Sequence, residues 1–149
     1  MRAVVQRVKK ASVKVDGKLV GEINEGLQVF LAICDNDNDE VIEWLCNKLV
    51  NLRIFRDENG KKNISLLDIS GDILIISNFT LYGDVKRGAR PNYMKSAHPD
   101  ISKPIYEKVI NYLKTNFPIK VEQGIFGAMM QVDLINDGPV TIVIDKENK

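Results

Sequence analysis

The sequence predicts a single α/β domain, built as a strand-rich barrel-like sheet or a three-layer sandwich with two main helices on one side. Many segments have strand-like patterns, several of them joined by hairpin-like turns, and only two have a helical period. A chain of 149 residues has the length of one domain and can bury about two-thirds of its unfolded surface. A hydrophobic content of 44% with 28% charged residues is typical of a globular protein. We therefore expect one domain over residues 1–149.

The N-terminal part of the chain is predicted to form three strands. Residues 2–15 form a long one, in which apolar and polar side chains alternate near its end. Asp16-Gly17 is a two-residue hairpin signal, which turns the chain into a second strand at Lys18–Ile23. Gly26 then precedes the apolar run 27–33, which is typical of a buried strand.

A first helix is predicted after the acidic loop that ends at Glu40. Asp37 and Glu40 have the spacing of a capping box. Apolar residues then recur close to a 3.6-residue period as far as Leu52. Trp44 lies within this helix, and we expect it to be a core anchor. Arg53-Ile54-Phe55 is expected to form a short strand.

The C-terminal half is predicted to contain the central strand and the second helix. Residues 57–60 form a turn, and Ile73–Ile76, the most apolar run, is the candidate central strand. A long polar segment covers residues 83–99. The second helix begins near Ser102, with Pro104 in its first turn, where proline is tolerated. Three further strands are expected at about 119–123, 129–135 and 140–145.

Bulk properties exclude several classes of protein. The net charge of +1 provides no broad basic field, so a nucleic-acid contact must rest on a local patch. No run reaches the roughly 18 apolar residues of a membrane span, and the N-terminus lacks a signal-peptide core. Cys34 and Cys46 have no CxxC spacing, and there is one histidine, which argues against a zinc site. We expect a cytoplasmic protein with no metal and no cofactor.

The most informative segment is Asn136-Asp137-Gly138-Pro139-Val140-Thr141, which lies between two strand-like runs. Proline removes a ladder donor, and glycine adopts backbone angles that other residues avoid. Such an insert presents bare main-chain carbonyls. By its local pattern alone, however, the segment is more typical of an ordinary hairpin turn.

A second candidate site follows the central strand, at Ser77-Asn78-Phe79-Thr80-Leu81. A hydroxyl nucleophile needs a base within hydrogen-bond reach. The only histidine is His98, and the chain has no Gly-x-Ser-x-Gly elbow, so a Ser-His-Asp triad is disfavoured. No carboxylate pair and no His/Asp/Glu cluster has the spacing of acid–base or metal chemistry. If the chain is an enzyme, backbone groups or the substrate must perform much of the chemistry.

The segment Lys86–Lys95 carries four cations and Tyr93 within a Gly- and Pro-containing stretch. Lys and Arg pair with phosphates, and tyrosine stacks on bases. We therefore identify Lys86, Arg87 and Arg90 as the candidate nucleic-acid-binding residues, although a solvated basic loop has the same composition.

Taken together, these segments resemble the D-aminoacyl-tRNA deacylases of the widespread bacterial and eukaryotic type, over nearly the whole chain. The most specific motifs are Asn136–Thr141, which fits without change, and Ser77–Leu81, in which Asn78 replaces the family's usual Gln. Met129 also stands where an acidic residue is common. Further matching segments are Met1–Val8, Ala11–Val13, Leu52–Phe55, Arg90-Pro91 and Gly124–Ala128.

The resemblance implies a homodimer with no cofactor, in which the Gly138-Pro139 segment of one subunit completes the site of the other. The family's cis Gly138–Pro139 bond projects two carbonyls toward the α-ammonium and α-carbon of the substrate. An L-aminoacyl side chain is then excluded by a carbonyl wall, whereas D-aminoacyl groups and glycine fit. The implied reaction is hydrolysis of D-aminoacyl-tRNA, and of glycyl-tRNA mischarged on tRNA-Ala, to free amino acid and tRNA.

The implied mechanism uses main-chain groups and the RNA itself. Main-chain N–H groups around Phe79 and Thr80 hold the oxyanion, and the 2′-OH of the terminal adenosine assists. The remaining implied roles concern the shape of the site. Ser77 and Asn78 shape the site, Phe79 forms the floor of its pocket, and Met130 lines that pocket. Arg7 braces the insert, which begins at Asn136. Phe126 either lines the pocket for the terminal adenine or belongs to the core.

Two other functions fit parts of the sequence. One is an esterase that uses Thr80 or Ser77 as a nucleophile on small esters. The other is a non-catalytic module that binds structured RNA through the basic segment. Hydrolysis of D-aminoacyl-tRNA by the purified protein separates both from the deacylase.

Overall fold

The structure is a computed structural model that describes residues 1–147. Its main sheet has six strands in the order β2-β1-β3-β6-β7, with β8 paired to β1. The strands of this sheet are β1 (Arg2–Val15), β2 (Lys18–Ile23), β3 (Gly26–Ala32), β6 (Asp72–Ser77), β7 (Val121–Gln123) and β8 (Gln131–Asp145). A separate hairpin pairs β4 (Phe55–Arg56) with β5 (Lys62–Ile64). The helices are α1 (Asp39–Asn51), α2 (Leu66–Ile69), α3 (Pro99–Asn116) and the 3-10 helix η1 (Phe79–Tyr82).

The long strand β1 organises the sheet. Its first half pairs antiparallel with β3, its second half pairs antiparallel with β2, and β8 runs antiparallel along most of its length. The pairs β3–β6 and β6–β7 are parallel. The sheet curls so far that β2 lies against β7, and a Cβ on Gly21 would stand 2.9 Å from the Gln123 carbonyl oxygen. The mixed sheet is therefore a nearly closed barrel, as the sequence predicted.

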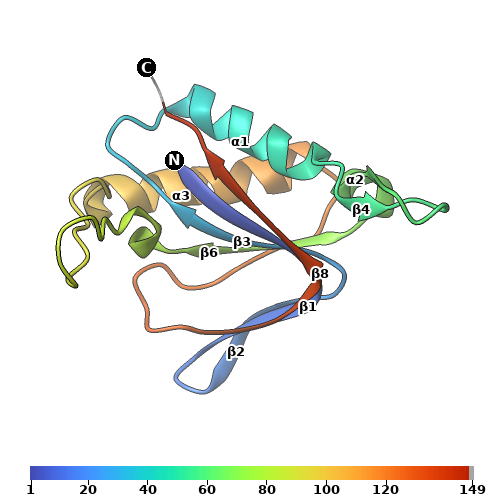
Figure 1. Cartoon of the computed structure of the whole chain (residues 1–149), viewed down its shortest axis with the longest axis horizontal. Helices are drawn as coiled ribbons and strands as arrows, with labels where there is room; N and C mark the ends of the chain where they lie inside the picture. Colours follow the sequence, from blue (N-terminus) through green and yellow to red (C-terminus); the bar gives the residue numbers. More distant parts are fainter. Residues whose placement is uncertain (148–149) are drawn as a thin grey trace.

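The helices α1 and α3 cover one side of this sheet (Figure 1), which confirms the predicted arrangement. The main hydrophobic core includes residues of β1, β3 and β6 and of both helices, among them Val5, Val29, Leu45 and Val109. A second core fills the curled part of the sheet. Its buried members are Val8, Ala11, Val13, Ile23, Leu74 and Ile76.

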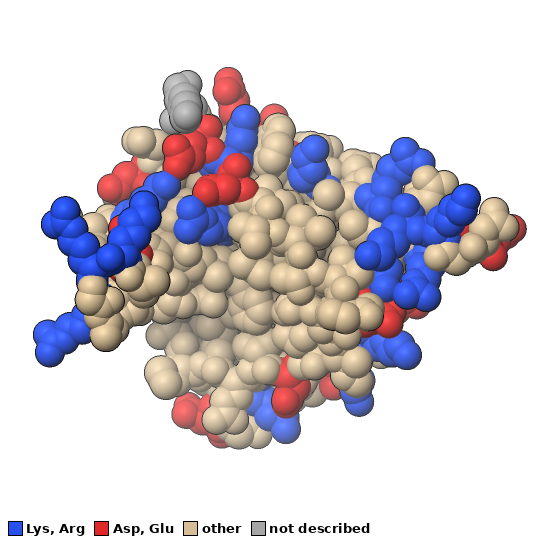
Figure 2. All heavy atoms as spheres, in the orientation of Figure 1, with Lys and Arg blue, Asp and Glu red and all other residues tan. Residues whose placement is uncertain are grey.

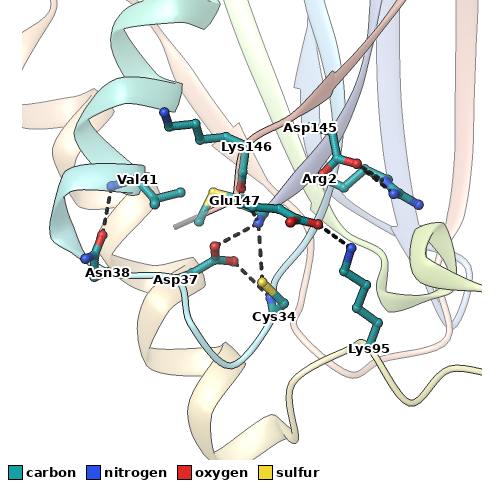
Figure 3. A network of polar contacts seen from close by, with 10 residues as sticks. Arg2, Cys34, Asp37, Asn38, Val41, Lys95, Asp145, Lys146 and Glu147 are labelled. Carbon is teal, nitrogen blue, oxygen red and sulfur yellow. Dashed lines mark hydrogen bonds and ion pairs between the residues drawn. The ribbon is translucent and has the colours of Figure 1, made fainter. Parts of the chain in front are cut away.

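The start of α1 differs from the prediction by one residue. The N-cap is Asn38, whose side chain accepts a hydrogen bond from the Val41 N–H at 3.1 Å. Asp37 is not the cap, because its buried carboxylate accepts from the Met1 amino group at 2.7 Å and from the Cys34 N–H at 2.9 Å (Figure 3). These contacts join the beginning of β1 to the connection between β3 and α1.

Trp44 is not the core anchor that the sequence predicted. Its side chain is 37% exposed, and Lys48 and Lys146 lie over the ring at 5.2 Å and 5.1 Å from its centre. The buried side of α1 runs through Leu45 and Leu49, and a residue one position away points about 100° around the helix. The indole therefore lies at the margin of the apolar stripe and is covered by cations.

Several boundaries also differ from the prediction. The helix α3 begins at Pro99, earlier than expected, because His98 caps it by accepting from the Asp100 N–H at 3.2 Å. The short strand lies at β4 rather than at residues 53–55. The sequence analysis missed β5, η1 and the short α2, although the capping box of Ser65 and Asp68 marks the start of α2.

The two C-terminal strands expected at 129–135 and 140–145 form one strand, β8. Asn136–Thr141 is therefore no hairpin turn. Gln6 pairs with Thr141 and Val8 pairs with Asn136, so one residue of β1 faces four residues of β8. The insert is a large bulge on a strand that pairs only with β1 among the described residues.

Within residues 1–147, no helix is long and apolar enough to cross a membrane.

Candidate active site

The first half of the site lies where two parallel strands end together. Leu31 of β3 is opposite Ser77 of β6, and the Asn78 N–H donates to the Leu31 carbonyl at 2.8 Å. The 3-10 helix η1 begins directly afterwards, and its first bonded N–H is that of Leu81, which donates to the Asn78 carbonyl at 3.3 Å. The first N–H groups of a helix have no partner within it. Those of Phe79 and Thr80 are therefore placed to bind an anion or an oxyanion.

The hydroxyl groups at this site have no base beside them. Thr80 Oγ1 donates to the Asn78 side-chain oxygen, which is an amide and does not take up a proton. His98 is bound to the start of α3, with Nδ1 at 3.4 Å from an Asp100 carboxylate oxygen. The described residues therefore contain no Ser-His-Asp arrangement around Ser77 or Thr80.

Phe79 is the exposed apolar residue of η1, with 56% of its surface accessible. Its ring meets Tyr93 edge to face with the centroids 5.1 Å apart, and its carbonyl accepts from Ser96 Oγ at 2.9 Å. Tyr93 and Ser96 lie within residues 83–98, which include the basic segment Lys86–Lys95. Tyr93, which was expected to stack on a base, therefore packs on Phe79 within the chain.

The second half of the site is the insert of β8, in which the Gly138–Pro139 peptide bond is cis. Asn136 closes the insert on itself. Its side-chain oxygen accepts from the Val140 N–H at 2.9 Å, and its side-chain nitrogen donates to Thr141 Oγ1 at 3.0 Å. Gly138 and Pro139 are exposed at the tip. The conformation of the insert is thus fixed by hydrogen bonds within the insert itself.

Gly138 is required by the backbone of the insert. Its φ angle is +140°, which L side chains rarely adopt. A Cβ there would stand 2.8 Å from Val140 Cγ2 and 3.3 Å from Arg7 Nη2.

Arg7 holds the insert from the side of the core. Its side chain is buried; Nε donates to the Asp137 carbonyl at 3.0 Å, and Nη1 donates to the Ile54 carbonyl at 2.7 Å. The Asp137 carboxylate lies 3.8 Å from Nε. The buried Nη2 has no hydrogen-bond partner in the part of the chain that the structure describes. One guanidinium therefore connects the insert to the segment before β4.

Met130 and Phe126, which precede β8 in the chain, are partly buried and pack against the two hydrophobic cores. Met130 packs against the second core, and its sulfur is so close to Gly124 that a Cβ there would stand 2.5 Å away. Phe126 packs on the main core, with its ring 5.8 Å from that of Tyr106. Burial raises the pKa of the Tyr106 hydroxyl, which donates to the Ile75 carbonyl at 2.8 Å. This environment favours the core assignment for Phe126.

The candidate tRNA-binding residues Lys86, Arg87 and Arg90 are exposed on the basic loop, which we define as residues 83–98. The loop is closed by paired main-chain hydrogen bonds between Asp84 and Asn92, of 2.8 Å and 2.9 Å. Figure 2 shows cations projecting at this end of the molecule. Lys95, the fourth cation, pairs with Glu147 instead (Figure 3).

Arg2 is a contact residue of η1 that the sequence analysis missed. Its guanidinium donates from Nη1 to the Leu81 carbonyl at 3.1 Å and from Nη2 to Asp145 at 2.7 Å, and it lies 4.9 Å from the centre of the Tyr82 ring. Burial raises the pKa of the Tyr82 phenol, so this hydroxyl is no base near neutral pH. An arginine at the start of a strand has no sequence signal that would have identified this role.

The two halves of the site are not joined within one chain. No hydrogen bond or ion pair connects Ser77–Leu81 to Asn136–Thr141 in residues 1–147. No group of three or more His, Cys, Asp or Glu among the described residues could hold a metal ion. Among the described residues, the arrangement provides main-chain N–H donors at one place and the exposed Gly138-Pro139 segment at another, without a side-chain nucleophile that has a base beside it.

Comparisons with known proteins identify the family of this chain. Residues 4–145 match the family model described as D-Tyr-tRNA(Tyr) deacylase. The chain is 58% identical to the D-aminoacyl-tRNA deacylase of Thermosipho africanus, covering 99% of this chain and 98% of that protein. It is 57% identical to the D-aminoacyl-tRNA deacylase of Aquifex aeolicus, covering 97% of both.

Two solved structures share the fold. One is described as the c-Myc DNA Unwinding Element Binding Protein and superimposes with a TM-score of 0.94 at 37% identity, covering 99% of this chain and 100% of that one. The other is described as a probable eukaryotic D-amino acid tRNA deacylase and superimposes with a TM-score of 0.85 at 18% identity, covering 97% and 98%.

The fold and these matches define the class as hydrolases that cleave the ester bond of aminoacyl-tRNA. The chain belongs to the D-Tyr-tRNA(Tyr) deacylase family.

Proposed function

We propose that this protein removes D-amino acids from tRNA and spares L-aminoacyl-tRNA by steric exclusion. The observation that carries the proposal is the preformed Gly138-Pro139 projection, which Asn136 closes on itself and Arg7 anchors to the core. A rigid pair of carbonyls can accept hydrogen bonds from an α-ammonium and leaves no room for a side chain on the same face of the α-carbon. A D-aminoacyl group directs its side chain away from that wall. Glycyl-tRNA, including glycine mischarged on tRNA-Ala, is also hydrolysed, because glycine has no side chain that the carbonyls could exclude.

The site is completed by a second copy of the chain. The insert and η1 share no hydrogen bond or ion pair among the described residues, although both are needed. The strand β8 has an open edge and carries exposed apolar side chains: Val143 is 65% exposed and Ile135 is 46% exposed. Open edges and apolar patches of this kind are commonly covered by association. The orphan Nη2 of Arg7 lies beside the insert and is a further group for which an acceptor from outside the chain is expected.

The reaction proceeds without a side-chain nucleophile. Water adds to the ester carbonyl, the N–H groups of Phe79 and Thr80 stabilise the oxyanion, and the tetrahedral intermediate releases the 3′-oxygen of tRNA with a proton. One oxyanion donor is typically worth about 3–4 kcal/mol. The free 2′-OH of the terminal adenosine assists the proton transfer. Phe79 forms the floor of the pocket, and Ser77, Asn78 and Met130 surround it. The basic loop binds the RNA. The reaction takes place in the cytoplasm, where tRNA is charged.

One experiment tests both the selectivity and the mechanism. The release of D-Tyr, L-Tyr and Gly from tRNA is measured with the purified protein. We expect D-Tyr and Gly to be released and L-Tyr to be retained. A substrate whose terminal 2′-OH is replaced by hydrogen should not turn over. Release of L-Tyr at the rate of D-Tyr would overturn the exclusion model, and full activity on the 2′-deoxy substrate would overturn the assistance by the RNA.

A further inference from the structure

We propose that the hairpin β4–β5 is a second RNA-binding surface, which contacts phosphates of the tRNA whose aminoacyl end lies in the partner subunit's site. This basic hairpin is defined as residues 53–64, with the cations Arg53, Arg56, Lys61 and Lys62. The inference rests on the proposed function, because it requires the insert of one subunit to complete the site of the other.

The cations of the basic hairpin are available to a ligand. Arg56, Lys61 and Lys62 are exposed, and none of them forms an ion pair with a residue that the structure describes. Figure 2 shows Lys and Arg gathered at this end of the molecule, opposite the end that carries the basic loop. The hairpin therefore concentrates positive charge in a protein whose net charge is only +1.

The hairpin presents these cations on a fixed backbone. Asp57 and Lys61 are joined by a main-chain hydrogen bond of 2.8 Å, and the Asp57 carboxylate accepts from the N–H groups of Asn59 and Lys61 at 2.9 Å and 3.0 Å. This carboxylate builds the turn and does not pair with a cation. Arg53 donates to the Asn63 carbonyl at 2.9 Å, which ties the two strands together. A preorganised set of cations loses less entropy when it binds.

Arg7 fixes where the hairpin stands relative to the site. Its guanidinium donates both to the Asp137 carbonyl of the insert and to the Ile54 carbonyl, one residue before β4. The base of the hairpin and the insert are therefore held to the same side chain. The basic loop, in contrast, is attached to η1 through the contact of Tyr93 with Phe79. A site built from η1 of one subunit and the insert of the other is consequently flanked by the basic loop of the first and the basic hairpin of the second.

The chemistry of the hairpin fits a phosphate backbone better than a protein surface. Its tip, residues 56–63, contains charged residues, asparagines and one glycine, and no apolar side chain. Protein interfaces are anchored by buried aromatic and apolar residues, whereas phosphate contacts are made by Arg, Lys and Asn and position the nucleic acid without reading its sequence. We therefore expect the hairpin to strengthen tRNA binding without contacting the ester.

The test neutralises Arg56, Lys61 and Lys62 together by substitution with Gln. The matched control neutralises three exposed lysines elsewhere, Lys103, Lys114 and Lys120, which likewise form no ion pair with a described residue. KM and kcat are measured with D-tyrosyl-tRNA over a salt series, and again with D-tyrosyl-adenosine, which retains the 2′-OH but lacks the RNA body. The hairpin variant should raise KM for the tRNA by about tenfold or more and lower the slope of log KM against log salt by about 2 to 3. Its kcat and its activity on D-tyrosyl-adenosine should be unchanged.

An unchanged KM and salt slope in the hairpin variant would overturn the inference, and so would an equal loss with the control or with D-tyrosyl-adenosine. If the parent protein hydrolyses neither substrate, it is the proposed function that fails. The two failures are thus distinguishable.

Mixed dimers test the assignment to the partner's site. One chain carries Pro139→Ala, so that only the site completed by the other chain's insert works. Neutralising the hairpin on the chain with the intact insert should raise KM, whereas neutralising it on the Pro139→Ala chain should not. The reverse pattern would overturn the inference.

Discussion

Arg7 Nε donates to the main-chain carbonyl of Asp137 at 3.0 Å from within the core of the protein. The arginine is 2% exposed, and its Nη1 donates at 2.7 Å to a second carbonyl, that of Ile54. A planar guanidinium holds two acceptors in fixed directions, which an ammonium group does not. The insert of β8 therefore has its orientation set by a residue on the neighbouring strand.

The first prediction concerns Arg7→Lys. The shorter, single-centred ammonium cannot satisfy both carbonyls, and a buried unpaired acceptor costs about 1–3 kcal/mol. We expect the free energy of unfolding to fall by about that amount, and kcat/KM for D-tyrosyl-tRNA to fall because the insert is no longer anchored. Urea denaturation and deacylation assays measure both. Arg56→Lys is the control, since Arg56 is exposed and forms no ion pair with a residue that the structure describes. Equal behaviour of the two variants would contradict the anchoring role.

The second prediction separates the two hydrogen bonds of Asn136. Asn136→Asp keeps an acceptor for the Val140 N–H but loses the donor to Thr141, whereas Asn136→Ala loses both. Each bond contributes about 0.5–1.5 kcal/mol to the closed insert. We expect the ratio of D-Tyr to L-Tyr release to decrease modestly in the Asp variant and further in the Ala variant. If both variants discriminate like the parent protein, the side chain is not needed to hold the insert.

The third prediction concerns Gly138→Ala. The positive φ angle and the 2.8 Å approach to Val140 leave no space for a methyl group. Backbone strain of this kind costs about 1–3 kcal/mol. We expect the variant to fold with reduced stability and to lose most deacylation activity, because the carbonyls of the insert are displaced. Gly88→Ala is the control, since Gly88 also has a positive φ angle but no atom within 4 Å of an added Cβ. It should lose stability to a similar extent or less, and keep its selectivity.

The fourth prediction tests the absence of a hydroxyl nucleophile. Thr80 Oγ1 is bonded to the Asn78 amide rather than to a base. Thr80→Ala should therefore retain substantial activity, within about tenfold of the parent protein, because the N–H of residue 80 is unchanged. Steady-state deacylation of D-tyrosyl-tRNA measures this. A fall to the uncatalysed rate would restore the esterase model in which Thr80 attacks the ester.

The fifth prediction concerns Cys46, which is buried between α1 and α3. Desolvation raises the pKa of its thiol from 9.0 to about 12. The folded state therefore prefers the neutral thiol; this contribution to stability is fully present below pH 9 and is lost as the pH rises from 9 toward 12. We expect Cys46 to resist alkylation at pH 8.5 in the native protein and to react after unfolding in urea. Rapid native labelling at Cys46, located by peptide mass, would show that the interface between the helices opens.

Much of the fold could be predicted because it is encoded locally. The alternation in residues 2–15 and the Asp16-Gly17 signal specify a hairpin that the structure confirms, with positive φ angles at both turn residues. The apolar run at 73–76 became the buried strand β6, flanked by β3 and β7. Periodicity and turn chemistry depend on residues a few positions apart, so they can be predicted from the sequence without knowledge of the tertiary structure.

Other features depended on neighbours distant in the chain. Asp37 has the spacing of a helix cap, yet its carboxylate is occupied by the Met1 amino group, and Asn38 takes its place. Trp44 is of a residue type that is usually buried, yet its position beside Leu45 places it at the margin of the buried face of α1. For Asp37 a contact made only in the folded chain decided between two locally acceptable caps, and for Trp44 the packing of α1 through Leu45 and Leu49 decided which side chains are buried.

The sequence by itself determined the strand and helix segments, the two motifs at 77–81 and 136–141, and the resemblance from which the family was recognised. Only the tertiary structure showed that the second motif is a bulge within one strand rather than a turn between two, because that depends on how β1 pairs across it. It also showed that Arg7 joins the insert to the basic hairpin, across separations of 130 and 47 residues. Side-chain hydrogen bonds between distant segments leave no periodic trace in a sequence, and the geometry of this site consists largely of such bonds.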